Sequence, residues 1–380
     1  MEFDINYENS IANEGSHERL HRLFKRAIKG EKLVIGFIGG SITQGSLSTA
    51  PDRCYAYHVY NWFKEKFRNS SFEYVNAGIG ATTSHFASAR CENDLLRYSP
   101  DFVITEFSVN DKNDEHFMEC YEGLIRRIYG DRSGGAVVIV NNVFYDSGKN
   151  AQSIHNKIGA HYNIPCISMQ SSIYPEVANG NIPNRLITPD DLHPNDLGHK
   201  LVASVIIYYL EKVLEEVKLL SYDNSIDNEK SISKNQLPSP LTANTYEHAY
   251  IYDNRNCSPK ALGFYADPAV QLAITDIFKN GWISEGLGSK IHFDVEGSGI
   301  AIQYRKSVKK PAEKILVVID GDENNSFIVD ANFDEDWGDK LELTTLLEHT
   351  DTSKHTVDIT VTDSSKDYVP FYLNSIIVSR

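Results

Sequence analysis

Short apolar runs alternate with amphipathic segments along the first 220 residues of the chain. The runs are bounded by glycine, proline and polar residues, which is typical of buried strands. The predicted strands span residues 33–38, 72–75, 101–107, 136–140 and 164–168. Between them, apolar residues recur every three or four positions, which predicts helices. The predicted helices span residues 16–29, 54–67, 84–98, 115–130, 149–162 and 196–219.

This alternation of strand and helix indicates βαβ units and a parallel sheet. We therefore expect a doubly wound, flavodoxin-like α/β/α domain over residues 1–220. Residues 1–15 are polar and weakly patterned, so we expect an extended lead-in there.

The pattern changes after residue 220. Residues 221–245 are rich in Ser, Asn, Asp, Lys and Pro, which predicts a linker. From 246 to 380, short alternating runs separated by Gly, Asp, Asn and Ser replace the helical pattern. These runs span residues 291–295, 300–304, 315–319, 356–361 and 371–378. They predict an all-β accessory domain, a sandwich or jelly roll.

Composition narrows the functional class. The 380 residues carry a formal net charge of −15, which disfavours a nucleic-acid partner. Five scattered cysteines without a CxxC spacing indicate free thiols in a reducing compartment. No leader pattern and no apolar run of about 18 residues is present. We therefore expect a cytoplasmic protein without a membrane partner.

Polar residues lie where the predicted strands end. Ser41 follows two glycines after the first strand, a glycine-rich turn at 76–84 follows the second, and Asn110 follows the third. Asp190 and His193 share the loop before the last helix. Because the carboxyl ends of parallel strands meet at one edge of a sheet, we expect these groups to converge. A hydroxyl, an imidazole, a carboxylate and N–H donors are what ester hydrolysis by serine requires.

The first predicted helix contains a literal HExxH sequence, His17 to His21. Two histidines one helical turn apart and a glutamate are typical of zinc peptidases. No third ligand is apparent in the residues that follow, so we interpret the motif as structural. We predict no metal and no cofactor, and keep a zinc peptidase as a remote alternative.

Four segments of the chain resemble the blocks that define the SGNH (GDSL-like) hydrolase superfamily. The first block corresponds to Gly39-Gly40-Ser41, and the third to Ser108-Val109-Asn110-Asp111. The last block, Asp-x-x-His-Pro, corresponds to residues 190–194. The glycine of the second block is best matched by Gly80, with Gly78 as the alternative. The resemblance covers about residues 30–220.

This resemblance implies a serine esterase that works through an acyl-enzyme. Its catalytic residues are Ser41, Asp190 and His193, and its oxyanion hole is formed by Ser41, Gly80 and Asn110. The sequence departs from the family pattern at Gly40, usually an aspartate, and at Ser108, usually a glycine. Asp191, next to Asp190, leaves open which aspartate faces the imidazole.

The substrate is less strongly indicated. Residues 296–300, 318–321 and 354–357 resemble the jelly-roll domain of two-domain carbohydrate esterases, although that domain precedes the catalytic one there. The resemblance implies a short-chain acyl ester, acetyl above all, on a small molecule or oligosaccharide. Three tryptophans are candidates for stacking on sugar rings, although core packing is the more ordinary role of each: Trp62, Trp282 and Trp337.

The alternatives are a lipase or thioesterase for longer acyl chains and a non-catalytic sugar-binding protein on the same scaffold. The sequence leaves open the acyl group, the alcohol, the regiospecificity, the role of the β domain and whether the chain forms a homo-oligomer.

Overall fold

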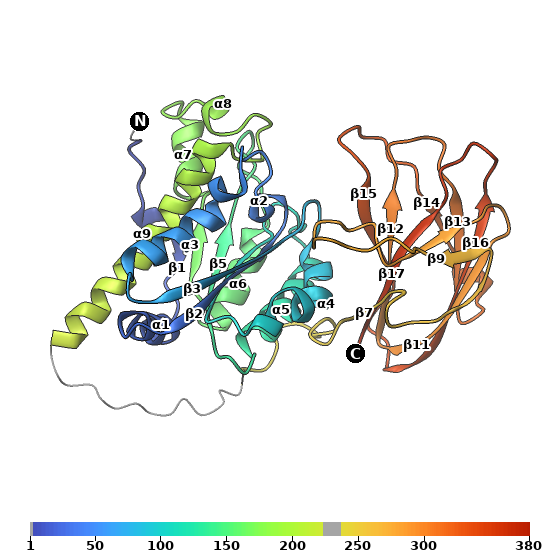
Figure 1. Ribbon diagram of the computed structural model, residues 1–380, viewed down its shortest axis with the longest axis horizontal. Coiled ribbons are helices and arrows are strands. Elements are labelled where there is room, and N and C mark those ends of the chain that lie inside the picture. The colour runs from blue at the N-terminus through green and yellow to red at the C-terminus, as the bar shows by residue number, and fades with distance from the viewer. Residues whose placement is uncertain (1–2, 223–236) are drawn as a thin grey trace. The chain divides into compact units, whose positions relative to one another are not determined.

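The computed structural model describes residues 3–222 and 237–380 (Figure 1). The chain divides into two units, Met1–Asn244 and Thr245–Arg380. Of the predicted linker, residues 223–236 lie outside the described residues. Residues 237–244 belong to the first unit, where the buried Glu122 carboxylate accepts the backbone N–H groups of Leu241 and Thr242 at 2.7 and 2.8 Å.

The first unit is built on a six-stranded sheet. Its five parallel strands are β2 (Lys32–Gly39), β3 (Ser71–Gly78), β4 (Phe102–Glu106), β5 (Ala136–Asn141) and β6 (Cys166–Ser168). Their spatial order, β6-β5-β4-β2-β3, is the flavodoxin-like order, so the predicted fold class is confirmed.

The expected lead-in also contains a strand. β1 (Ile11–Asn13) pairs antiparallel with β6 and extends the sheet at that edge. A strand is extended chain, as expected for residues 1–15, but its pairing with the sheet and the 3₁₀ turn before it, Glu8–Ser10, were not predicted. Three residues are too few to show an alternating pattern.

Helices cover both faces of this sheet (Figure 1). α1 and α3 pack with α9 on one face, and α4 and α6 flank α5 on the other. The bounds are α1 (Glu18–Ile28), α3 (Tyr55–Lys66), α4 (Ser84–Asp94), α5 (Glu115–Tyr129), α6 (Gln152–His161) and α9 (Asp196–Tyr222). Side chains from α1, α3, α9 and the sheet form one apolar core. None of the helices among the described residues is both long enough and apolar enough to cross a membrane.

The sequence pattern did not predict three short helices: α2 (Ser41–Gln44), α7 (Ile173–Ala178) and α8 (Asn184–Ile187). Segments of four to six residues show no helical periodicity. The predicted helix 84–98 ends as an α-helix at Asp94 and is followed by a 3₁₀ turn, Leu96–Tyr98.

The second unit is all β, as predicted. One antiparallel sheet has the order β15-β12-β17-β10-β9, with β7 on β17, and the other has the order β14-β13-β16-β11-β8. Apolar side chains of both sheets form a single core. The strands are β7 (Tyr250–Tyr252), β8 (Lys260–Leu262), β9 (Phe264–Ala266), β10 (Trp282–Ser284), β11 (Lys290–Gly297), β12 (Gly299–Lys306), β13 (Lys314–Ile319), β14 (Phe327–Asp330), β15 (Lys340–Leu347), β16 (Ser353–Asp363) and β17 (Tyr372–Ser379).

Candidate active site

Ser41 follows two tightly packed glycines, Gly39 and Gly40. β2 ends at Gly39, and Ser41 is the first residue of α2. A Cβ on Gly39 would lie 2.1 Å from Thr43 Oγ1, and one on Gly40 would lie 2.3 Å from Asn110 Oδ1. Both distances are far shorter than van der Waals contact. The family pattern has an aspartate at the position of Gly40. Because glycine has no side chain, Asn110 can lie directly against the turn that carries Ser41, the nucleophile turn.

A hydrogen-bonded chain joins Ser41, His193 and Asp190. His193 Nε2 lies 2.8 Å from Ser41 Oγ, and His193 Nδ1 lies 2.6 Å from Asp190 Oδ2. Asp190 Oδ1 accepts the backbone N–H groups of Leu192 and His193 at 3.1 and 2.7 Å. Partial burial acts to raise the pKa of Asp190, but these hydrogen bonds outweigh it and hold that pKa below its ordinary value. The carboxylate therefore fixes the imidazole with Nε2 facing the serine.

The structure places Asp190, and not Asp191, against the imidazole. Asp191 has a left-handed backbone, with φ of 70°. Its carboxylate is bound by Asn184 and by Arg185, the latter at 2.7 Å. Asp191 thus holds the loop to α8.

Of the two candidate glycines, Gly80 is the one beside the nucleophile. A Cβ on Gly80 would lie 3.7 Å from Ser41 Cβ. Gly78 instead packs against α2, where a Cβ would lie 2.2 Å from the Gln44 nitrogen, and its N–H donates to Asn76 Oδ1 at 2.9 Å. The Gly80 N–H donates to Gln44 Oε1 at 2.6 Å. The predicted oxyanion donor therefore has a side-chain acceptor in this structure.

A buried arginine holds the two strand ends together. Arg90 on α4 is 2% exposed and donates to the Ala77 carbonyl at 2.8 Å and to the Gly39 carbonyl at 3.3 Å. Asp94 pairs with the same guanidinium at 3.1 Å. Sequence reasoning missed this residue. The available signal was one arginine among the small residues Ala87, Ser88 and Ala89 of a predicted helix.

The loop that carries Asn110 is fixed by a buried hydrogen bond between a histidine and an aspartate. Asp111 Oδ2 lies 3.1 Å from His155 Nε2, and neither side chain is exposed. Asp111 Oδ1 accepts the Ser84 N–H at 2.9 Å, at the start of α4. The His155 ring stacks on Tyr121 at 3.7 Å between centroids. These contacts tie the end of β4 to α4, α5 and α6. The sequence analysis included Asp111 in a family block but predicted none of these contacts.

A buried carboxyl group lies next to the nucleophile turn. Glu106, the last residue of β4, is not exposed, and its Oε2 accepts a hydrogen bond from Thr43 of α2 at 3.2 Å. Burial raises the pKa of Glu106 to about 7, against the opposing effect of its hydrogen bonds. The uncharged acid is thus the form that the folded protein favours below neutral pH.

A second Ser–His–Asp chain lies in the β unit. Ser353 Oγ is 2.9 Å from His355 Nε2, and His355 Nδ1 is 2.7 Å from Asp320 Oδ2. Asp320 Oδ1 also accepts the Thr356 N–H at 2.8 Å. These bonds attach the turn after β13 to β16. Ser353 begins an antiparallel strand and lacks the glycine turn that exposes backbone donors beside Ser41.

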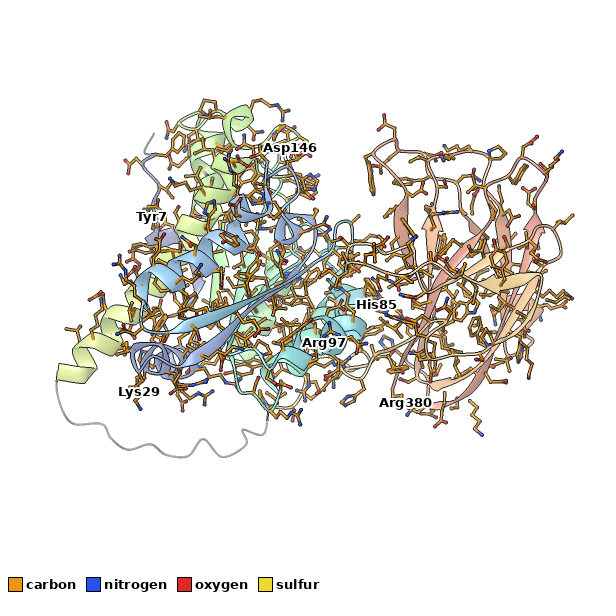
Figure 2. All side chains as sticks on the ribbon, viewed as in Figure 1. Tyr7, Lys29, His85, Arg97, Asp146 and Arg380 are labelled. Atoms are coloured by element: carbon orange, nitrogen blue, oxygen red, sulfur yellow. The ribbon has the colours of Figure 1, made fainter. Side chains whose placement is uncertain are left out.

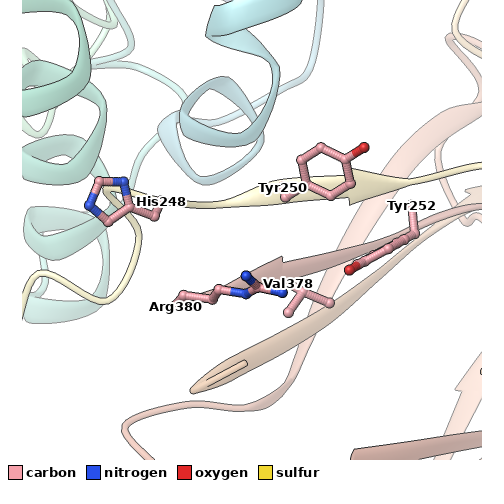
Figure 3. A pocket seen from close by; sticks show the side chains of 5 residues that line it. All are labelled: His248, Tyr250, Tyr252, Val378 and Arg380. Atoms are coloured by element: carbon pink, nitrogen blue, oxygen red, sulfur yellow. The ribbon is translucent and has the colours of Figure 1, made fainter. Parts of the chain in front are cut away.

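The second unit has a hollow of about 640 Å³ lined by His248, Tyr250, Tyr252, Val378 and Arg380 (Figure 3). The two tyrosines come from β7, which pairs with β17. Among the described residues, the five side chains that line it include no serine and no carboxylate.

The structure adds a neighbour to the HExxH motif that the sequence did not show. A third candidate ligand exists, because Glu216 of α9 lies against both His17 and His21. The sequence could not show it, since Glu216 is 195 residues beyond His21.

Comparisons with known proteins agree with this geometry. The GDSL-like Lipase/Acylhydrolase family model matches residues 37–201. A two-domain esterase (CEX) active on acetylated mannans is 53% identical, with a TM-score of 0.93 and coverage of 99% of both chains. The same kind of esterase co-crystallised with mannopentaose is 52% identical, with a TM-score of 0.93 and coverage of 99% of this chain and 98% of the other. No curated protein matches the chain.

Glu106→Gln should change how stability depends on pH. In the wild type, the carboxyl ionises near pH 4.5 when unfolded and near 7 when folded. Below about pH 4.5, Glu106 therefore contributes about 3 kcal/mol to the free energy of unfolding, and this contribution is lost as the pH rises to about 7. Glutamine mimics the protonated acid and does not ionise, so the stability of the variant should not show this decline between pH 4.5 and 7. Calorimetric midpoints of the first unit at pH 5, 6, 7 and 8 measure it, and parallel profiles for the two proteins would contradict the assignment.

Ser41→Ala should abolish esterase activity, with a loss of about 10³-fold or more. Ser353→Ala is the matched control, because it removes the hydroxyl of the other Ser–His–Asp chain. It should retain wild-type turnover of a chromogenic acetyl ester. A serine-directed phosphonate should label wild type and Ser353→Ala but not Ser41→Ala. Labelling of Ser41→Ala would show that the nucleophile lies elsewhere.

Proposed function

Since this chain belongs to the SGNH (GDSL-like) hydrolases and is a two-domain carboxylic ester hydrolase, we propose that it removes acetyl groups from mannans or mannan-derived oligosaccharides. The observation that carries the proposal is the likeness to esterases active on acetylated mannans over 99% of the chain, both units included. The serine, histidine and aspartate described above supply the chemistry.

We propose a two-step acyl transfer. Ser41 Oγ attacks the acetyl carbonyl carbon while His193 Nε2 takes its proton, and Asp190 stabilises the resulting imidazolium. The sugar hydroxyl leaves when the C–O bond breaks, and it takes that proton from His193. Water then attacks the acetyl-enzyme by the same route, releasing acetate and Ser41.

The oxyanion forms in both steps and needs donors at the strand ends. The Ser41 N–H, the Gly80 N–H and the Asn110 side-chain amide are the groups that fit this role. Removing one such donor typically costs about 3 kcal/mol of transition-state stabilisation. Because Gln44 Oε1 accepts the Gly80 N–H, the substrate oxygen must displace Gln44 before this donor can act.

An exposed tryptophan supports a carbohydrate substrate. Trp62 packs among Phe24, Phe63 and Phe67, and Trp282 is buried. Trp337, after β14, has 54% of its surface exposed and rests edge-on against Phe333. An exposed indole face suits stacking on a pyranose ring. We therefore propose that the second unit, which we expect to be of jelly-roll type, holds the glycan chain.

We also propose a cytoplasmic location, where imported oligosaccharides rather than polymers would be the substrate. All five cysteines are free thiols, which supports a reducing compartment.

Two substitutions of Gln44 should change the rate of ester turnover in opposite directions. Gln44→Met removes the acceptor at similar length, so kcat/KM for a small acetyl ester should rise a few-fold. Gln44→Glu places a carboxylate beside the developing oxyanion, so kcat should fall at least about tenfold. Steady-state kinetics of both variants measure this. A loss of similar size in both would mean that Gln44 supports the turn rather than competing with substrate.

The acyl-chain preference tests the function directly. The wild type should cleave an acetyl ester at least about tenfold faster than a decanoyl ester and should release acetate from acetylated mannooligosaccharides. Chromogenic assays and mass spectrometry of the sugars measure both. A preference for decanoyl would favour a lipase or thioesterase. Labelling of Ser41 by the phosphonate, without turnover of any ester, would show an intact nucleophile with another substrate.

A further inference from the structure

Two histidines and a glutamate converge where α1 meets α9, outside the esterase site. His17 immediately precedes α1 and His21 lies on it, one helical turn further on, while Glu216 projects from α9. The His17 Nδ1 and His21 Nε2 atoms lie 2.8 and 3.0 Å from the same oxygen, Glu216 Oε2. The three ligand atoms fall within 4.8 Å of one another. We propose that this cluster, the His17–His21–Glu216 cluster, is a zinc site.

The ligand set fits zinc in number and kind. Imidazole nitrogen and carboxylate oxygen are zinc ligands at about 2.0–2.2 Å, and two histidines with a glutamate leave a fourth tetrahedral position for water. Tetrahedral ligands at that bond length lie about 3.3 Å apart. The two nitrogen–oxygen distances, 2.8 and 3.0 Å, are within a few tenths of an ångström of this spacing.

The charges around the cluster favour a cation. Glu216 supplies a carboxylate whose Oε2 already contacts both imidazoles. Glu14 adds a second carboxylate, with Oε1 at 3.5 Å from His17 Nε2. Lys212 Nζ lies 3.5 Å from the same Glu14 oxygen and 3.4 Å from Glu8 Oε2, so these contacts join three carboxylates and one ammonium group.

This second carboxylate lies near the outer nitrogen of His17. Within the described residues, His17 Nε2 is buried and has no hydrogen-bond partner. When Nδ1 binds a metal, the proton of the neutral ring must sit on Nε2, which faces Glu14. A carboxylate that accepts the outer N–H of a metal-bound histidine is the usual support of zinc sites.

The cluster is remote from the ester chemistry. α9 begins at Asp196, shortly after His193, and Glu216 lies 20 positions further along that helix, or about 30 Å at 1.5 Å per residue. Glu18, the glutamate of the HExxH sequence, is exposed. Zinc here would therefore cross-link α1 to α9 and stabilise the first unit, without acting on the acetyl group.

Titration of the metal-free full-length chain with ZnCl₂ at pH 7.5 tests the proposal. Isothermal calorimetry should show a site in the wild type whose affinity falls at least tenfold in Glu216→Gln and in His21→Gln. Both replacements keep a hydrogen-bonding group, so the fold should persist. His248→Gln is the matched control, since it removes an exposed histidine of the second unit, and should bind like the wild type.

Thermal unfolding supplies an independent readout. At a zinc concentration of about 100 times Kd, the Tm of the first unit should rise by about 5–10 °C in the wild type and in His248→Gln. It should not rise in Glu216→Gln. Turnover of a chromogenic acetyl ester should be the same with zinc and with chelator, apart from this effect on stability.

The proposal is overturned if the wild type binds no zinc, or if Glu216→Gln and His21→Gln bind it as tightly as the wild type. A second group that could hold a metal, His85, His116 and Cys120, lies on α4 and α5, with His85 at the start of α4 (Figure 2). Loss of the whole zinc signal in Cys120→Ser, with none lost in Glu216→Gln, would assign the metal there and refute the His17–His21–Glu216 cluster.

Discussion

The active site depends on holding the ends of three parallel strands side by side. Gly39 is in register with Gly78 on one neighbouring strand and with Glu106 on the other. Arg90 donates to backbone carbonyls on two of these strand ends from within the protein interior. A buried guanidinium needs such acceptors, because an unpaired charge is costly away from water. The same bonds that satisfy the arginine therefore fix the distance between Ser41 and Gly80.

The third strand end is fixed by different means. Glu106 and Asp111 are both buried near the nucleophile turn, but only Asp111 is paired with an ionisable base, His155. Burial dominates at Glu106 and raises its pKa to about 7. Below that pH the acid is mostly uncharged and adds little negative charge where an oxyanion must form. Asp111, the residue after Asn110, anchors its loop through hydrogen bonds to His155 and to the Ser84 N–H.

The sequence predicts those parts of the site that follow directly from position at a strand end. Ser41, Asn110, Asp190 and His193 could be proposed because apolar runs locate the strand ends and the family blocks mark the residues. Gln44, Arg90 and His155 could not, because their partners are backbone groups or side chains distant in sequence. Glu216 is the clearest case, since it reaches His21 across 195 residues. β1 was missed for a different reason, since its three residues show no periodicity.

The two Ser–His–Asp chains of this protein show what the hydrogen-bonded chain alone contributes. The distance from the serine Oγ to the histidine Nε2 is 2.8 Å at Ser41 and 2.9 Å at Ser353. The distance from the histidine Nδ1 to the aspartate Oδ2 is 2.6 Å in the first chain and 2.7 Å in the second. Ser353 lies on an antiparallel strand that pairs with β11 on one side and with β13 on the other, and the Thr356 N–H of this strand donates to Asp320 Oδ1. Ser41 lies at a helix start after a parallel strand, where N–H groups remain available for an oxyanion. Histidine and aspartate can activate a hydroxyl in either place, but only the strand-end turn can also stabilise the transition state.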